Sequence, residues 1–157
     1  MKRKIILITG IIGIIIAIIF FIAIIKNIFF TDGQTKLYED GWTAYENKQY
    51  DLTIFYLNKV EKNKYPDIVA PLGFSYFEKK DFQNTISNLK EAYDKKIGEK
   101  EGYYDKIANT LGISYLEKGD YDKSELYLKK AQELGNENAL RNLQILDSLQ
   151  QSQQKRP

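Results

Sequence analysis

The chain begins with one long apolar run and continues with short amphipathic segments. From Ile5 to Ile25 the only polar side chain is that of Thr9. At about 1.5 Å per helical residue, this run makes roughly 31 Å of helix, which matches the hydrocarbon core of a bilayer. A run of isoleucine favours a strand in water, but lipid requires every backbone group to be paired within the segment. We therefore predict a single transmembrane helix over residues 5–25.

A cleaved signal peptide is the alternative interpretation, because Lys2, Arg3 and Lys4 form a positive start. The apolar run is longer than the usual core of a signal peptide, and no small-residue cleavage site follows it. We therefore prefer an anchor. Residues 1–4 carry three bases, whereas only Lys26 follows the run closely, so the positive-inside rule predicts a cytoplasmic N-terminus. The rest of the chain is then expected outside the cell (inner) membrane, as in a single-pass protein.

Small residues fall on one face of this predicted helix. Gly10, Gly13 and Ala17 follow one another at intervals of three and four residues, and Gly13 with Ala17 makes a small-x-x-x-small pair. Such a pair lets a second helix pack closely in a membrane. The alternative is that these small residues have no role, since many spans contain some.

Beyond the apolar run, the pattern of hydrophobic residues repeats. Gly41, Gly73 and Gly112 each open a similar stretch, and an aromatic residue follows nine positions later at Tyr50, Phe82 and Tyr121. Repeats of 32 and 39 residues are typical of stacked helical units. The third copy is the clearest, and it contains Ala108, Leu111, Gly112, Tyr115, Gly119, Asp120, Tyr121, Ser124, Leu128 and Ala131.

This spacing resembles the tetratricopeptide repeat. The resemblance covers about residues 34–138 and implies an all-α fold, in which each copy is a helical hairpin and the hairpins stack as an α-solenoid. The implied hairpins span about 34–65, 66–99 and 105–138. Five extra residues between the second and third copies fall within 96–104. A capping helix over 139–150 is indicated by an apolar recurrence at Ala139, Leu140, Leu143, Leu146 and Leu149.

Two connecting segments complete the predicted organisation. Residues 26–33 form a short tether between the anchor and the repeats, and even fully extended they reach only about 28 Å. The repeat domain, residues 34–150, is therefore expected to stay near the membrane. The tail at 151–157 contains no apolar residue, and we expect it to be disordered.

The resemblance also implies a binding surface. In tetratricopeptide proteins the first helices of successive hairpins line a concave groove that takes peptides or helices. The positions that match this groove form two apolar rows beside a row of acids: Trp42, Tyr45, Glu46, Phe74, Phe77, Glu78, Ile113, Leu116 and Glu117. Such a stripe suits a partner with apolar anchors flanked by Lys or Arg. The alternative is that the aromatic residues only pack between neighbouring hairpins.

Charge and composition exclude several classes of function. The net charge of +2 is uneven, because beyond residue 26 there are 19 bases against 21 acids. This mildly acidic part lacks the basic face that nucleic-acid binding requires. The chain contains no Cys and no His, so it lacks the usual general base and the commonest metal ligands. We expect neither catalysis nor a cofactor or metal.

Together these features predict a membrane-tethered scaffold that binds a protein or peptide partner in its groove. The alternative is a structural subunit that self-associates into a homo-oligomer, through the face of Gly10, Gly13 and Ala17 and through the ends of the repeat stack. In both cases the lipid bilayer contacts residues 5–25.

Overall fold

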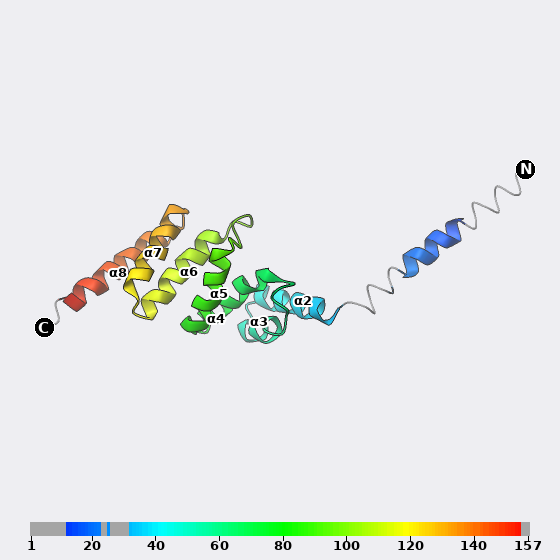
Figure 1. Ribbon diagram of the computed structural model, residues 1–157, viewed down its shortest axis with the longest axis horizontal. Helices are drawn as coiled ribbons and strands as arrows, with labels where there is room; N and C mark the ends of the chain where they lie inside the picture. Colours follow the sequence, from blue (N-terminus) through cyan, green and yellow to red (C-terminus); the bar gives the residue numbers. More distant parts are fainter. Residues whose placement is uncertain (1–11, 23–24, 26–31, 155–157) are drawn as a thin grey trace, which may run out of the picture. The chain divides into compact units, whose positions relative to one another are not determined.

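The computed structural model describes residues 12–22, 25 and 32–154, and all of their secondary structure is helical (Figure 1). The all-α prediction is confirmed for these residues. The helices are α2 (Gly33–Glu46), α3 (Tyr50–Leu57), the 3-10 helix η1 (Pro66–Ile68), α4 (Val69–Glu78), α5 (Phe82–Asp94), α6 (Tyr104–Glu117), α7 (Tyr121–Glu133) and α8 (Ala139–Gln154). The chain divides into two compact units, Met1–Lys36 and Leu37–Pro157.

In the first unit, residues 12–22 form a helix whose residues are all exposed. Among the described parts of the chain, no helix combines the length and the apolar character needed to cross a bilayer. Parts of the span predicted over 5–25 lie outside the described residues, namely 5–11, which include Gly10, and 23–24. The predicted N-terminal segment 1–4 and most of the tether, 26–31, lie outside them as well. Gly13 and Ala17 lie in the described helix, and a Cβ added to Gly13 would meet no other atom within 4 Å.

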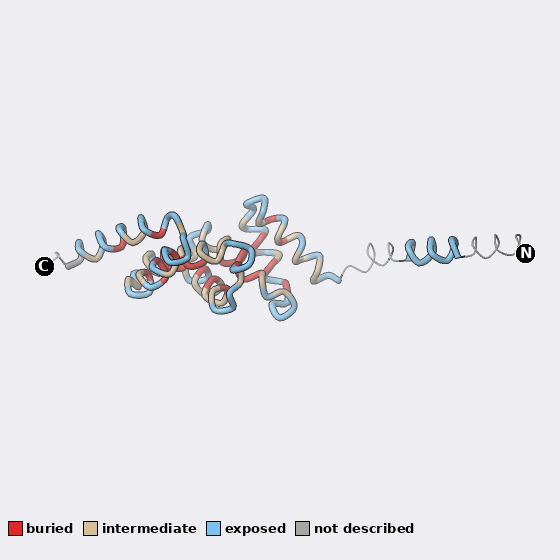
Figure 2. Tube along the Cα trace, turned by 90° about the horizontal axis from the view of Figure 1, so that it is seen from above, coloured by how far each residue is buried: buried red, intermediate tan, exposed pale blue. Residues whose placement is uncertain are grey.

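In the second unit, successive helices pack against one another from α3 to α8. Three buried clusters connect them. Leu57, Val60, Ile68 and Leu72 join α3 to α4, and a larger cluster centred on Leu89, Ile107 and Leu111 joins α4 and α5 to α6 and α7. Ala108, Ala131 and Ala139 then join α6 and α7 to α8. Figure 2 shows buried and exposed stretches alternating along these helices, as expected for helices that each bury one face.

In each hairpin the two helices approach closely where a glycine of the first helix faces a leucine of the second. A Cβ added to Gly41, Gly73 or Gly112 would overlap the side chain of Leu57, Leu89 or Leu128, respectively. One helical turn before these leucines lie the fully buried small residues Thr53, Thr85 and Ser124. The Thr53 and Thr85 hydroxyls donate to the carbonyls of Gln49 and Asp81, at 3.2 and 2.9 Å. A buried threonine is thus tolerated because its hydroxyl is hydrogen-bonded.

The turns between paired helices share one conformation. The residue seven positions after each repeat glycine (41, 73 and 112) has a positive φ. The values are 57° at Lys48, 59° at Lys80 and 76° at Gly119. In the second and third hairpins an aspartate then caps the next helix, because Asp81 accepts a hydrogen bond from the Asn84 amide and Asp120 from the Lys123 amide. The Gly-Asp-Tyr sequence at 119–121 therefore encodes a left-handed residue followed by an N-cap.

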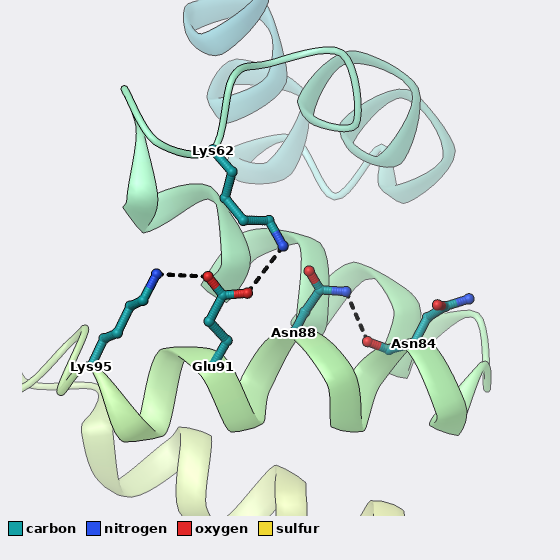
Figure 3. Close-up of polar contacts among 5 residues, drawn as sticks. All are labelled: Lys62, Asn84, Asn88, Glu91 and Lys95. Carbon is teal, nitrogen blue, oxygen red and sulfur yellow. Dashed lines mark hydrogen bonds and ion pairs between the residues drawn. The ribbon is translucent and has the colours of Figure 1, made fainter.

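On the outer side of α5, Glu91 connects two hairpins. Its carboxylate accepts hydrogen bonds from Lys62, in the segment after α3, and from Lys95, at 3.1 and 2.8 Å (Figure 3). The hydrogen bonds to Lys95 and then Lys62 lower the pKa of Glu91. In the same view Asn88 donates to the Asn84 carbonyl, one turn earlier on α5. Both lysines are exposed, so these ion pairs add little stability.

The C-terminal helix differs from its prediction in two respects. It continues to Gln154, so residues 151–154 of the tail expected to be disordered are helical, while residues 155–157 lie outside the described residues. Glutamine is a good helix former, and the Ser152 hydroxyl bonds the Leu149 carbonyl. Of the predicted capping residues, Ala139 and Leu146 are buried, but Leu140 and Leu149 are 54% and 41% exposed. A spacing of three residues drifts around a helix, so these two leucines lie on opposite sides.

Candidate functional site: an aromatic groove

The second unit contains a groove of about 540 Å³ formed mainly by four of its segments, with Tyr50 of α3 and Tyr103 of the α5–α6 connection completing the lining. Its walls come from the C-terminal half of α2, most of α4, the N-terminal half of α6 and the connection between α7 and α8. The lining residues are mainly aromatic on the α2 and α4 side and polar on the α6 side: Trp42, Tyr45, Tyr50, Ala70, Pro71, Phe74, Phe77, Glu78, Tyr103, Lys106, Asn109, Thr110, Asn136 and Asn138.

Four aromatic rings follow one another along one wall of the groove, and we call them the aromatic belt: Trp42, Tyr45, Phe74 and Tyr103. The ring centres of Trp42 and Tyr45 are 6.0 Å apart in an edge-on arrangement, and those of Tyr45 and Phe74 are 6.5 Å apart and stacked. The Tyr103 ring meets Phe74 edge-on at 6.4 Å. These are the geometries that aromatic pairs prefer. All four side chains are half-buried, so the belt keeps part of its apolar surface open to a ligand.

Tyr103 reaches the belt from the extra residues between α5 and α6. Its ring lies against Gly98, where a Cβ would overlap it, and the φ of Gly98 is +88°. The amides of Tyr103 and Tyr104 both donate to the Gly98 carbonyl, at 2.9 and 3.1 Å. Glycine is required at position 98 for both the backbone conformation and the ring contact. The insertion is therefore an organised turn that places an aromatic ring in the groove.

A second hollow, of about 580 Å³, lies beside this turn. It shares Trp42 and Tyr103 with the groove and is otherwise lined by Asp67 and residues 95–101. Trp42 and Tyr103 thus separate two adjoining hollows. The side chains of this second hollow are mostly charged and exposed, so it offers little apolar surface for binding.

The polar wall of the groove is held by hydrogen bonds to neighbouring helices. Asn109 accepts from the Asn142 side chain of α8 at 2.8 Å, and Asn136 donates to Asp105 at 2.8 Å. Because these amides are tied to their neighbours, they form a stiff side of the groove. Lys106 is exposed and is the basic side chain of this wall.

Burial and nearby carboxylates both raise the pKa values of the tyrosines that line the groove. Burial, followed by the charges of nearby tyrosines and of Glu78, raises the pKa of Tyr45 to about 12. Burial and then Glu78 also raise the pKa of Tyr50. At the other end of the belt, burial followed by the charges of Glu101 and Asp67 raises the pKa of Tyr103. The tyrosines are therefore neutral hydrogen-bonding groups at physiological pH.

The structure brings together some of the residues predicted for the groove and leaves others out. Trp42, Tyr45, Phe74, Phe77 and Glu78 line it, whereas Glu46, Ile113, Leu116 and Glu117 do not. Phe74 also packs against the core cluster between α4 and α6, so the aromatic residues both stabilise the stack and line the groove. Tyr50, Tyr103 and the polar wall also line the groove and were not predicted from the sequence.

Within the described ranges, no cluster of acidic side chains is arranged to hold a metal ion. Comparisons with protein-family models and with curated proteins find no match to this chain. The tetratricopeptide resemblance therefore rests on the spacing of the residues and on the helical hairpins themselves.

Proposed function

We propose that this chain is a membrane-tethered binding module of tetratricopeptide type, which takes a peptide or a segment of another protein in its aromatic groove. The main support for this proposal is the aromatic belt, whose four half-buried rings line a groove large enough for several side chains. Buried tryptophan and tyrosine anchors dominate the energetics of protein interfaces. A groove lined by apolar rings with a polar opposite wall suits an extended segment.

The anchor belongs to the same proposal. The described helix at 12–22 consists of Ile, Phe, Gly and Ala only, with every residue exposed, and the apolar run extends from Ile5 to Ile25 in the sequence. Lipid would cover such a surface. With the N-terminus in the cytoplasm, as the bases at positions 2–4 favour, the groove would serve a partner on the outer side of the cell membrane.

A pair of double variants tests the groove. Trp42→Ala with Phe77→Ala removes two lining rings, while Ile113→Ala with Leu116→Ala removes the side chains at the equivalent repeat positions that do not line the groove. We expect the first pair to lower capture of a crosslinked partner in native membranes at least about tenfold, since each ring is worth more than about 1 kcal/mol in a buried contact. The second pair should retain capture.

Thermal unfolding of both double variants provides the control for folding. All four side chains are half-buried, so similar losses of stability are expected. Equal losses of capture in the two double variants would contradict a role for the groove.

A further inference from the structure

The groove carries an acidic group that the fold does not use. Glu78 ends α4 with an exposed side chain, and among the described residues no basic side chain pairs with it. The neighbouring Lys79 pairs instead with Asp51, at 2.9 Å. Glu78 therefore faces the groove with its charge available to a ligand.

The aromatic rings beside Glu78 add to this negative potential. The face of an aromatic ring carries partial negative charge, and several rings around one space attract a cation. The belt supplies four rings in sequence from Trp42 to Tyr103, and Tyr50 and Phe77 extend the wall toward Glu78. The carboxylates of Asp67 and Glu101 lie near the other end, since both act on Tyr103.

The basic side chain in the groove lining, Lys106, indicates where a positively charged group of a ligand would bind. Lys106 lies near the start of α6, one turn after Tyr103, whereas Glu78 ends α4. A positive group in the groove would be repelled by Lys106 and attracted to Glu78, so it would settle at the α4 side. A negative group on the same ligand would fit the opposite wall.

We propose that the aromatic belt receives an arginine side chain of the partner segment, with the guanidinium stacked on the rings and paired with Glu78. This inference rests on the proposed function and names the chemistry that the groove selects. Arginine fits better than lysine because its planar, weakly hydrated head stacks on aromatic faces and can pair with a carboxylate through two parallel hydrogen bonds. A wholly apolar anchor would leave the charge of Glu78 without a partner at the mouth of the groove.

Intrinsic fluorescence gives a direct test, because Trp42 is the single tryptophan of the chain and lies in the belt. The full-length chain in lipid nanodiscs is titrated with two end-blocked tripeptides, leucine-arginine-leucine and leucine-citrulline-leucine. Citrulline keeps the shape of arginine and removes its charge. We expect the citrulline peptide to bind about fivefold more weakly, because it loses both the cation–π contact with the rings and the ion pair with Glu78.

Two matched variants test whether Glu78 is the carboxylate that pairs with the arginine. Glu78→Gln should reduce the preference for arginine over citrulline to what the ring faces alone provide, whereas Glu117→Gln, at the same repeat position on α6 but outside the groove, should leave the preference unchanged. Both glutamates are exposed, so neither change threatens folding. An equal effect of the two variants would overturn the pairing with Glu78.

The outcomes separate this inference from the proposed function. Equal binding of both peptides to the unmodified chain would overturn the cation inference and leave an apolar groove that binds by burial alone. The absence of a saturable change in Trp42 fluorescence with either peptide at millimolar concentration would contradict both proposals.

Discussion

Replacing Gly73 with alanine is expected to lower the free energy of unfolding by about 2 kcal/mol, although alanine is the better helix former. An added Cβ would overlap the Leu89 side chain and lie 3.2 Å from its backbone nitrogen. The helices α4 and α5 must then move apart, and such overpacking costs roughly 1–3 kcal/mol, more than the gain of up to about 1 kcal/mol in helix propensity. Urea unfolding of the full-length chain, followed by circular dichroism, measures the difference.

A double-mutant cycle shows whether the close approach is the cause. Leu89→Ala alone should cost about 3 kcal/mol, because Leu89 is fully buried and its removal leaves a cavity. In the double variant the alanine at position 73 meets no leucine side chain, so the total cost should be well below the sum of the two. Gly33→Ala is the matched control, since a Cβ there meets nothing within 4 Å. Additive costs would contradict the close approach.

The second large effect is expected at Gly98. Alanine at this position would keep a strained positive φ and would also overlap the Tyr103 ring. We expect a loss of stability of about 2–3 kcal/mol together with weaker binding in the groove, because Tyr103 must leave its contact with Phe74. Thermal unfolding and partner capture measure the two effects.

The same turn provides its own control. Gly102 also has a positive φ, of 76°, but a Cβ there meets no atom within 4 Å. Gly102→Ala should therefore cost only the backbone strain of about 1 kcal/mol and leave binding unchanged. If the two alanine variants behaved alike, Tyr103 would have no special place in the groove.

The repeat pattern was sufficient to predict the all-α fold of the described residues. Glycines at positions 41, 73 and 112 mark the repeat in the sequence, and in the structure each faces a leucine of the partner helix. This worked because close packing leaves a local signature, a glycine and a small residue at fixed spacing. The path of the groove was predicted only in part, since it depends on how the hairpins stack.

The third hairpin shows why. The prediction used the same repeat positions in all three copies, which assumes that the groove crosses each first helix at the same level. In the structure the lining moves from the C-terminal half of α2 to the N-terminal half of α6, where Lys106, Asn109 and Thr110 line the groove instead of Ile113 and Leu116. A twist between successive hairpins shifts the facing turn in this way. Tyr103 was missed because the insertion has no counterpart in the other copies.

Site-specific photocrosslinking tests the central claim, that the aromatic groove is the partner-binding surface, most directly. A photoreactive benzoylphenylalanine is placed at Phe77, which lines the groove, or at Leu116, which holds the same repeat position outside it. In native membranes we expect a discrete crosslinked partner from position 77 and none from position 116, with the product at 77 lost when Trp42 is changed to alanine. A partner that crosslinks equally from both positions, or from position 116 alone, would contradict the claim.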